Sequence, residues 1–127
     1  IAKNNAKSFH ADTYVFDSKP ELKLFLQLLA SSRVKKTYFT GMFTADQTDF
    51  YVPYVDPESN RLRKYYPDFL VEMEDGNYLI LEVKGDHMYD DPVVKAKEAA
   101  AEEIAVESSM KYELLKSTDI MDGKVEI

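Results

Sequence analysis

The stretch from Tyr66 to Gly85 constrains the fold more than any other part of the chain. It contains two apolar, β-prone runs on either side of the turn-forming residues 74–77, Glu-Asp-Gly-Asn, and this pattern predicts a β-hairpin. Three charged residues interrupt the runs: Asp68 at the start of the first, and Glu82 and Lys84 at the end of the second. Buried acids and lysines are rare unless they are paired or bind a metal. The predicted hairpin is therefore also the first candidate for a functional site.

The length of the hairpin loop decides whether the two acids meet. A two-residue turn sets Asp68 opposite Val83. A three-residue loop at residues 74–76, ending in a left-handed glycine, sets Asp68 opposite Glu82 and pairs apolar with apolar residues along the rest of the hairpin. We therefore expect the second register, with the backbones of the two acids about 5.5 Å apart and Lys84 on the same face of the sheet.

Two opposed carboxylates destabilise a strand pair unless something neutralises them. A divalent cation does so, and Asp68, Glu82 and the main-chain carbonyl of Val83 form a set of hard oxygen ligands suited to Mg²⁺, with Mn²⁺ as a substitute. Such a metal ion polarises a phosphodiester and helps to deprotonate water, while Lys84 beside it positions that water. The residues thus indicate phosphodiester hydrolysis; the alternative is a surface hairpin with incidental charges.

Pro67-Asp68, followed across a hairpin by Glu82-Val83-Lys84, resembles the signature of the PD-(D/E)xK nuclease superfamily. The resemblance implies an α/β, restriction-endonuclease-like core: a central mixed β-sheet flanked by helices, in the order α-β-β-β-α-β. It also implies a Mg²⁺-dependent DNA endonuclease. Many superfamily members have a glutamate on the first helix near the metal, and Glu21 is the candidate here. The spacing of Glu21 from Ser18 is also that of a capping box, so a purely structural role stays open.

Within the superfamily, residues 13–116 look most like the C-terminal nuclease domain of the restriction subunit of type III restriction enzymes. The residues that carry this likeness are Asp17-Ser18, Glu21, Tyr54, Tyr66-Pro67-Asp68-Phe69, Glu82-Val83-Lys84-Gly85 and Lys95-Ala96-Lys97-Glu98-Ala99-Ala100. In that family the domain follows a helicase-type motor. We expect residues 1–127 to be a single nuclease domain, and, because the chain begins at Ile1 rather than Met, a piece of a longer protein. It would be a C-terminal fragment of a larger helicase-nuclease that acts on double-stranded DNA with a methyltransferase or specificity subunit.

Composition narrows the remaining classes of function. A chain of 127 residues suits one domain with a real core. The absence of cysteine excludes disulfides and thiolate zinc sites and suits a reducing cytoplasm, where we expect the protein to act. No apolar run approaches the length of a membrane span. The net charge of −7 argues against strong autonomous binding to nucleic acid, so we expect other parts of the parent protein to hold the DNA.

Helices and further strands are predicted on both sides of the hairpin. Capping signals predict a helix from Ser18 to about Ser31, with a buried face of Leu22, Phe25, Leu26 and Leu29. Asp91 and Pro92 start a second helix that ends near Ser108, with an inward stripe of Val93, Lys97, Ala100 and Ile104. Strands are expected at residues 13–16, 49–55 and 110–116. Residues 34–43 are either a strand or a short helix.

Basic side chains near the motif are candidates for DNA binding. The most basic cluster of the chain, Arg61, Arg63 and Lys64, is either a solvated loop or a phosphate contact. Lys97 on the inward stripe either snorkels to solvent or faces the site. No role is assigned to His10 or His87, which are more simply explained as surface histidines.

The leading hypothesis is therefore the DNA-cleaving module of a type III restriction enzyme. One alternative is another nuclease of the same fold, such as a junction resolvase or a transposon-end endonuclease. The other is a catalytically silent interaction module. The acidic net charge favours this module, whereas the intact set of Asp68, Glu82 and Lys84 opposes it.

Overall fold

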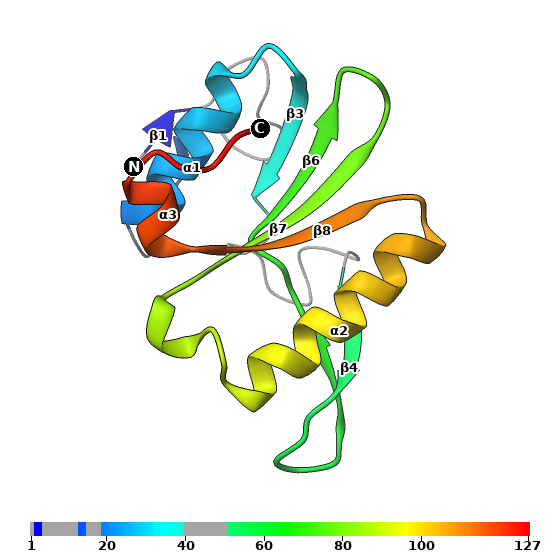
Figure 1. Cartoon of the computed structure of the whole chain (residues 1–127). Helices are drawn as coiled ribbons and strands as arrows, with labels where there is room; N and C mark the ends of the chain where they lie inside the picture. The colour runs from blue at the N-terminus through cyan, green and yellow to red at the C-terminus, as the bar shows by residue number, and fades with distance from the viewer. Residues whose placement is uncertain (1, 4–12, 15–18, 40–50) are drawn as a thin grey trace.

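A mixed four-stranded sheet forms the centre of the molecule (Figure 1). The computed structural model describes residues 2–3, 13–14, 19–39 and 51–127. The strands lie in the order β3 (Val34–Phe39), β6 (Phe69–Met73), β7 (Tyr78–Lys84) and β8 (Lys111–Lys116). The pairs β3–β6 and β6–β7 are antiparallel, whereas β8 runs parallel to β7. Because α1 (Lys19–Ala30) precedes β3 and α2 (Pro92–Glu107) connects β7 to β8, the core has the expected α-β-β-β-α-β order.

Smaller elements surround this core. A hairpin of β4 (Val52–Val55) and β5 (Leu62–Tyr65) is inserted between β3 and β6 and forms its own two-stranded sheet. Strands β1 (Ala2–Lys3) and β2 (Thr13–Tyr14) pair with each other. The 3-10 turn η2 (Asp86–Met88) follows β7, and α3 (Ser117–Met121) follows β8. Within the described segments, no helix combines the length and the apolar character that a membrane span requires.

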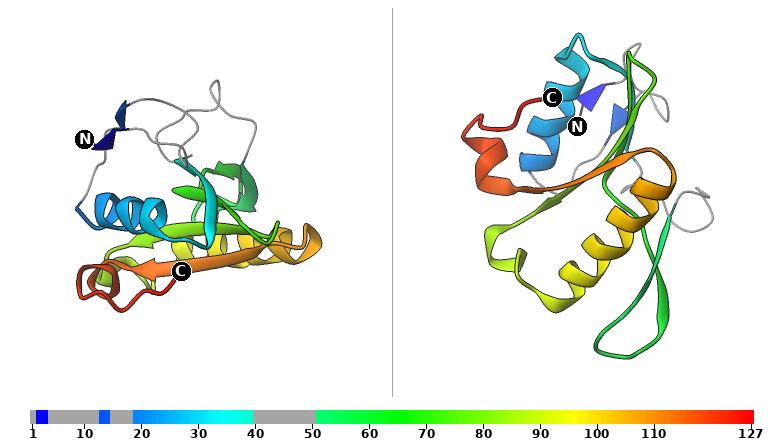
Figure 2. Two further views of the ribbon diagram at one scale, coloured as in Figure 1. Left: turned by 90° about the horizontal axis from the view of Figure 1, so that it is seen from above. Right: turned by 45° about the vertical axis from the view of Figure 1, so that its right-hand side comes forward.

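The two faces of the sheet have different characters. On one face, Phe69 and Val71 of β6 and Leu81 of β7 pack with Phe25 of α1 and Ile120 of α3 into the main apolar core. On the other face, α2 packs over β8 and β4, and a smaller cluster joins Val52, Tyr54, Tyr65 and Ala101. Two turned views show α1 and α3 on one side of β7 and β8, and α2 on the other (Figure 2). Since side chains alternate along a strand, Glu82 and Lys84 face the α2 side, opposite to Leu81.

The first predicted helix ends where expected, and three of its four predicted core residues, Leu22, Phe25 and Leu29, contact the main core. Helix α1 ends at Ala30, close to the expected Ser31, while its predicted start at Ser18 lies outside the described residues. Its fully buried side chains are Leu24, Phe25 and Leu28. The placement of Leu26 on the buried face was wrong, because that side chain is 51% exposed.

The second predicted helix is confirmed at both ends. Asp91 caps α2 by accepting hydrogen bonds from the backbone N–H groups of Val93 and Val94, and Pro92 occupies the first turn. Residues Val93, Ala100 and Ile104 contact the smaller cluster, as the stripe predicts. The residues most deeply buried are one position further along, at Val94, Ala101 and Ala105.

The remaining strands agree in part with the prediction. Residues 34–39, left open between strand and helix, form β3, and β8 begins one residue after its expected start. The expected strands at 13–16 and 49–55 are described only as Thr13–Tyr14 and Val52–Val55. The basic segment around Arg63 is not a loop but strand β5. Helix α3 was missed, because its five residues are too short to show a helical period.

Candidate active site

The β6–β7 hairpin has the three-residue loop that the sequence predicts. The backbone N–H of Met73 donates to the Asn77 carbonyl at 2.8 Å, and that of Gly76 donates to the Met73 carbonyl at 3.0 Å. Gly76 has a φ of 89°, the left-handed conformation that the loop requires. Along the strands, Phe69 pairs with Leu81, Leu70 with Ile80 and Val71 with Leu79. The predicted register is confirmed.

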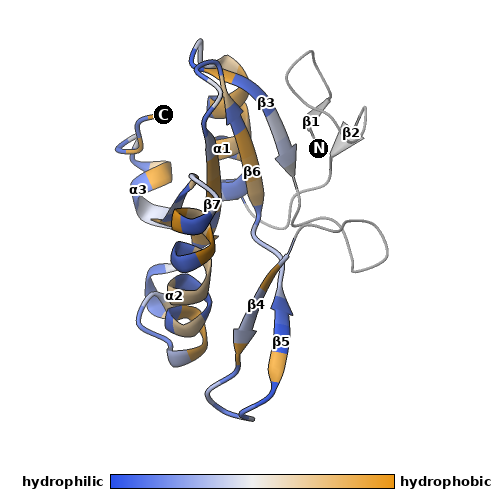
Figure 3. Cartoon of the chain, turned by 90° about the vertical axis from the view of Figure 1, so that its right-hand side faces the viewer, coloured by the Kyte–Doolittle hydropathy of each residue, from blue (hydrophilic) through white to orange (hydrophobic). Residues whose placement is uncertain are grey.

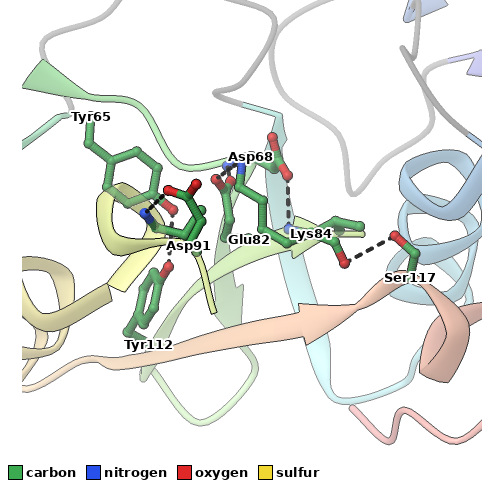
Figure 4. A network of polar contacts seen from close by, with 9 residues as sticks. Tyr65, Asp68, Glu82, Lys84, Asp91, Tyr112 and Ser117 are labelled. Carbon is green, nitrogen blue, oxygen red and sulfur yellow. Dashed lines mark hydrogen bonds and ion pairs between the residues drawn. The ribbon is translucent and has the colours of Figure 1, made fainter. Parts of the chain in front are cut away.

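This register brings the two acids of the motif together (Figure 4). The backbone N–H of Asp68 donates to Glu82 Oε1 at 3.0 Å, and the backbone N–H of Val83 donates to Asp68 Oδ2 at 2.9 Å. Asp68 is half-buried, whereas Glu82 is only 4% exposed. Main-chain donors from the facing strand therefore fix one oxygen of each carboxylate.

Burial sets the protonation of this acid pair. It raises the pKa of Asp68, which the neighbouring Glu82 carboxylate raises further, to about 8; the hydrogen bond from Val83 opposes the shift. Burial also raises the pKa of Glu82, although Lys84 and the hydrogen bond from Asp68 act to lower it. Two carboxylates this close repel each other, and the single ammonium group of Lys84 offsets only one of their two charges. We therefore expect the pair to hold a proton near neutral pH unless a further cation is present.

Lys84 supplies one positive charge at the pair. Its Nζ lies 3.6 Å from Glu82 Oε2, and its side chain remains 28% exposed. The Lys84 main chain is anchored separately, because Ser117 Oγ donates to its carbonyl at 3.1 Å. The strand end is thus fixed by β8 and α3, while the ammonium group stays accessible to solvent. This arrangement suits a lysine that contacts a substrate as well as Glu82.

Lys97 on α2 adds a second ammonium to the same region. It lies 5.3 Å from the ring centroid of Tyr65 and 5.6 Å from that of Tyr54, which places it against two aromatic faces. Burial lowers the pKa of Lys97, and the positive charge of Lys84 lowers it further. Of the two alternatives that the sequence left open, the structure thus supports a Lys97 that faces the site.

Two tyrosines near Glu82 were missed by sequence reasoning. Tyr65, at the end of β5, is 3% exposed, and its hydroxyl lies 3.1 Å from that of Tyr112 on β8. The polar contact of Tyr65 acts to lower the pKa of Glu82. Burial strongly raises the pKa of Tyr65 itself, so its hydroxyl stays protonated and able to donate. Tyr65 lies three residues before Asp68, which is a usable signal. Its pairing with Tyr112, 47 residues away, depends on the tertiary fold.

Other predicted site residues are not assembled with the pair. Glu21 lies on α1, which packs against the opposite face of the sheet. Within the described residues, no three acidic, histidine or cysteine side chains form a group that could hold a metal. The expectation that Glu21 adds a third carboxylate thus has no support in this arrangement. Arg63 is paired with Asp56 at 2.9 Å, and Arg61 and Lys64 lie exposed on the β4–β5 hairpin. His87 is exposed on η2, and His10 lies outside the described residues.

The acid pair fits a divalent metal by the chemistry of its donors. Each carboxylate has one oxygen fixed by a backbone N–H, and burial raises the pKa of both acids, a cost that a bound cation would offset. Asp68, Glu82 and the Val83 carbonyl supply hard oxygens, and Mg²⁺ commonly keeps several waters beside one or two carboxylates. Two acids therefore suffice for a partly hydrated ion.

A comparison with known protein families tests the assignment of the chain to the PD-(D/E)xK superfamily. The model of a family described as TnsA-like endonuclease N terminal matches residues 42–117, which is more than half of the chain. The chain belongs to this family. TnsA-like endonuclease domains are members of the PD-(D/E)xK superfamily, so the assignment made from the motif is confirmed. Nucleases of this superfamily typically use Mg²⁺.

The matched segment includes Asp68, Glu82, Lys84 and Lys97 of this TnsA-like domain, but not Glu21. The match does not support the narrower likeness to the type III restriction subunit. No curated protein matches the chain.

Proposed function

We propose that this TnsA-like domain is a Mg²⁺-dependent DNA endonuclease that cleaves phosphodiester bonds at the ends of a transposon. The observation that carries the proposal is the reciprocal hydrogen bonding of Asp68 and Glu82, with the Lys84 ammonium 3.6 Å from Glu82. The family match supports nuclease chemistry, and it favours the transposon-end setting over the type III setting.

Each residue of the site has a distinct task in this proposal. Asp68, Glu82 and the Val83 carbonyl would hold Mg²⁺, which would supply Lewis-acid activation of the phosphodiester and of water. Lys84 is placed to orient the attacking water and to offset negative charge on the phosphate. Lys97, held against the rings of Tyr54 and Tyr65, is placed to contact a phosphate beside the scissile one. Double-stranded DNA is the substrate, and other subunits or domains supply most of the affinity, because the chain carries a net charge of −7.

The proposal is tested by cleavage of plasmid DNA in the full-length protein with the components it requires. The substrate carries a transposon end, and Mg²⁺ is compared with EDTA. Asp68→Asn, Glu82→Gln and Lys84→Met each keep the shape of the side chain, and each is expected to lower the rate at least about 100-fold. Normal cutting by all three variants would exclude this site.

Two matched controls separate the site from general effects of charge. Glu72 lies on β6, four residues from Asp68, and is paired with Lys35 at 3.7 Å. Lys111 is exposed at the opposite end of β8 from Lys116, the partner of Lys84. Glu72→Gln and Lys111→Met should therefore cleave like the parent.

The choice of substrate separates the two nuclease settings, while metal binding tests the silent module. A transposon-end endonuclease cuts the plasmid that carries the end and spares the same plasmid without it, whereas equal cutting of both favours another nuclease role. A silent interaction module has no need of a metal site. Calorimetric titration with Mn²⁺ that shows no binding, in a protein that does not cleave, would favour this module.

A further inference from the structure

The β4–β5 hairpin, here called the arm (residues 51–66), projects from the body of the domain (Figure 3). In the described part of the chain, these two strands pair only with each other as a sheet. At its base, Tyr65 is followed by Tyr66 and Pro67 and then directly by Asp68. Only Pro67 therefore separates the arm from the first acid of the site.

The inner face of the arm is fixed against α2. Side chains alternate along β4 between buried and exposed, and the buried ones are Val52 and Tyr54. They join Tyr65 of β5 and Ala101 of α2 in the smaller apolar cluster. Lys97 lies against this same face, over Tyr54 and Tyr65. The position of the arm relative to the acid pair is thus set by packing.

The outer face of the arm is exposed and partly apolar. Val55 and Leu62 are directly opposed in the strand register and are 58% and 75% exposed. Opposed residues on paired strands point to the same side, so these two side chains form one apolar contact surface. They contribute little to the stability of the domain because they remain in water, so a partner that covered them would gain the free energy of apolar burial that folding does not provide.

Basic side chains flank this apolar pair. The arm has three basic residues against two acidic ones, in a chain whose net charge is −7. Asp56 neutralises Arg63 at 2.9 Å and also accepts from the Glu58 N–H, so this ion pair stabilises the turn. Arg61 and Lys64 form no ion pair with an acid among the described residues. Lys64 instead lies 4.7 Å from the ring centroid of Tyr51. The arm therefore offers two cations, Arg61 and Lys64, that are available to contact phosphates.

We propose that the arm lies in a groove of the DNA duplex next to the scissile phosphate, with Val55 and Leu62 against base or sugar edges and Arg61 and Lys64 on phosphates. This inference rests on the proposed function. A two-stranded β-ribbon fits the major groove of B-DNA, and apolar side chains there contact the thymine methyl group. Basic side chains without base contacts position the protein on the duplex.

The chain length between arm and site limits where the contact falls. Leu62 is six residues from Asp68, and at about 3.3 Å per extended residue the two are at most about 20 Å apart. With one base pair per about 3.4 Å of duplex, that distance corresponds to about six base pairs. The arm therefore contacts DNA within about half a helical turn of the cut.

Site-directed radical cleavage tests this placement, and the absence of cysteine from these 127 residues makes the labelling specific. Leu62→Cys is labelled with an iron–EDTA reagent in the full-length protein, with any cysteine outside this chain replaced by serine. Asp68→Asn is added so that the bound DNA stays intact. Leu26→Cys is the matched control, because Leu26 is 51% exposed on α1. The cut made by the parent protein with Mg²⁺ marks the reference position.

The outcomes separate the arm from the nuclease. Radical cleavage within about six base pairs of the reference cut from position 62, and not from position 26, supports the proposal. If the DNA around a normal reference cut stays intact, the proposed DNA contact of the arm is wrong, while the proposed nuclease function is unaffected. Radical cleavage of a protein subunit instead of DNA would show that the arm is a protein-binding surface and would also contradict the proposal. Absence of any Mg²⁺-dependent cut by the parent removes the nuclease proposal, and the arm's DNA role with it.

A second measurement does not depend on the label. The double variant Val55→Asn, Leu62→Asn changes only exposed side chains, so it should fold normally. We expect it to bind the cleavage substrate about tenfold more weakly, because two aliphatic side chains lose their contact with DNA. Leu26→Asn should bind like the parent. Unchanged binding by the double variant, with an unchanged melting temperature, would contradict the proposal.

Discussion

Asp68 and Glu82 each accept a hydrogen bond from the backbone on the other side of the hairpin. The Asp68 N–H donates to Glu82 Oε1 at 3.0 Å, and the N–H of Val83, next to Glu82, donates to Asp68 Oδ2 at 2.9 Å. The acids are therefore oriented by the backbone of the hairpin and do not depend on a metal for their placement. The same closeness keeps two carboxylates in a buried setting, which raises the pKa of both. The site thus opposes stability in the absence of a cation.

Asp68→Asn should make the metal-free protein more stable, and more so at high pH. The pKa of Asp68 rises from its usual 3.8 to about 8 in the folded state. Between these values the folded state binds more protons than the unfolded state, so its stability falls as the pH rises from about 4 to about 8. The variant lacks this loss. We expect its advantage in unfolding free energy to grow by more than about 1 kcal/mol between pH 5 and pH 8.

Urea unfolding in EDTA at the two pH values measures this difference. Asparagine keeps an oxygen that can accept from the Val83 N–H, so the hairpin contact survives the change. Glu72→Gln on β6, the strand that directly follows Asp68, is the control. If the advantage of Asp68→Asn over the parent is the same at pH 5 and pH 8, the acid pair does not share a proton.

Metal binding should release protons and strengthen with pH. Mg²⁺ binds the ionised carboxylates, whereas the raised pKa values mean that the metal-free pair holds a proton near neutral pH. The affinity should therefore increase from pH 6 to about pH 8 and then level off. Calorimetry in two buffers with different ionisation enthalpies gives the number of protons released. A value of zero at pH 7 would contradict the shared proton.

Much of the site was predictable because it is local in sequence. The turn residues 74–77 fix the register of the hairpin, and that register brings Asp68 opposite Glu82. The length of the loop was therefore enough to predict that the two acids meet. Asp91 and Pro92 likewise fixed the start of α2. The environment of the pair was not local. Tyr112 and Lys97 reach it from β8 and α2, and no spacing in the sequence encodes how those elements pack. Arg63 looked like a phosphate contact because its partner Asp56 becomes visible only when the turn is folded.

Lys97→Met should slow cleavage while leaving the fold intact. Methionine keeps the apolar stem against Tyr54 and Tyr65 but removes the charge that lies near Lys84 and Glu82. A phosphate contact that strengthens during the reaction predicts a fall in rate of about 10–100-fold at saturating DNA. Lys95→Met is the control, since Lys95 is exposed on the same helix and pairs with Asp90 and Glu98. Equal rates for both variants would assign Lys97 to packing alone.

Thr37→Val should stabilise the domain without affecting cleavage. Thr37 on β3 is fully buried, and its hydroxyl is the one buried side-chain polar atom in the described residues that lacks a hydrogen-bond partner. Valine has nearly the same shape and keeps the β-branch, so it removes the unsatisfied group without leaving a cavity. We expect a gain of about 1 kcal/mol in unfolding free energy, measured by urea denaturation. A loss of stability would show that the hydroxyl is satisfied in solution.

Tyr65→Phe should weaken metal binding more than it changes the rate at saturating metal. The Tyr65 hydroxyl acts to lower the pKa of Glu82, and Tyr112 lies 3.1 Å behind it. Phenylalanine keeps the ring that faces Lys97 but leaves Glu82 harder to ionise. Loss of such an outer contact typically lowers metal affinity about 10–100-fold.

The half-saturating Mn²⁺ concentration should therefore rise by about tenfold or more in Tyr65→Phe, and less in Tyr112→Phe, which retains the hydroxyl nearest Glu82. Tyr78→Phe, at the far end of β7, is the control. A purely structural role for Tyr65 predicts a different pattern: a lower melting temperature and a lower rate that added metal does not restore. Recovery of the parent rate at high Mn²⁺ separates the two, because a positioning residue for Glu82 acts through the affinity for the ion.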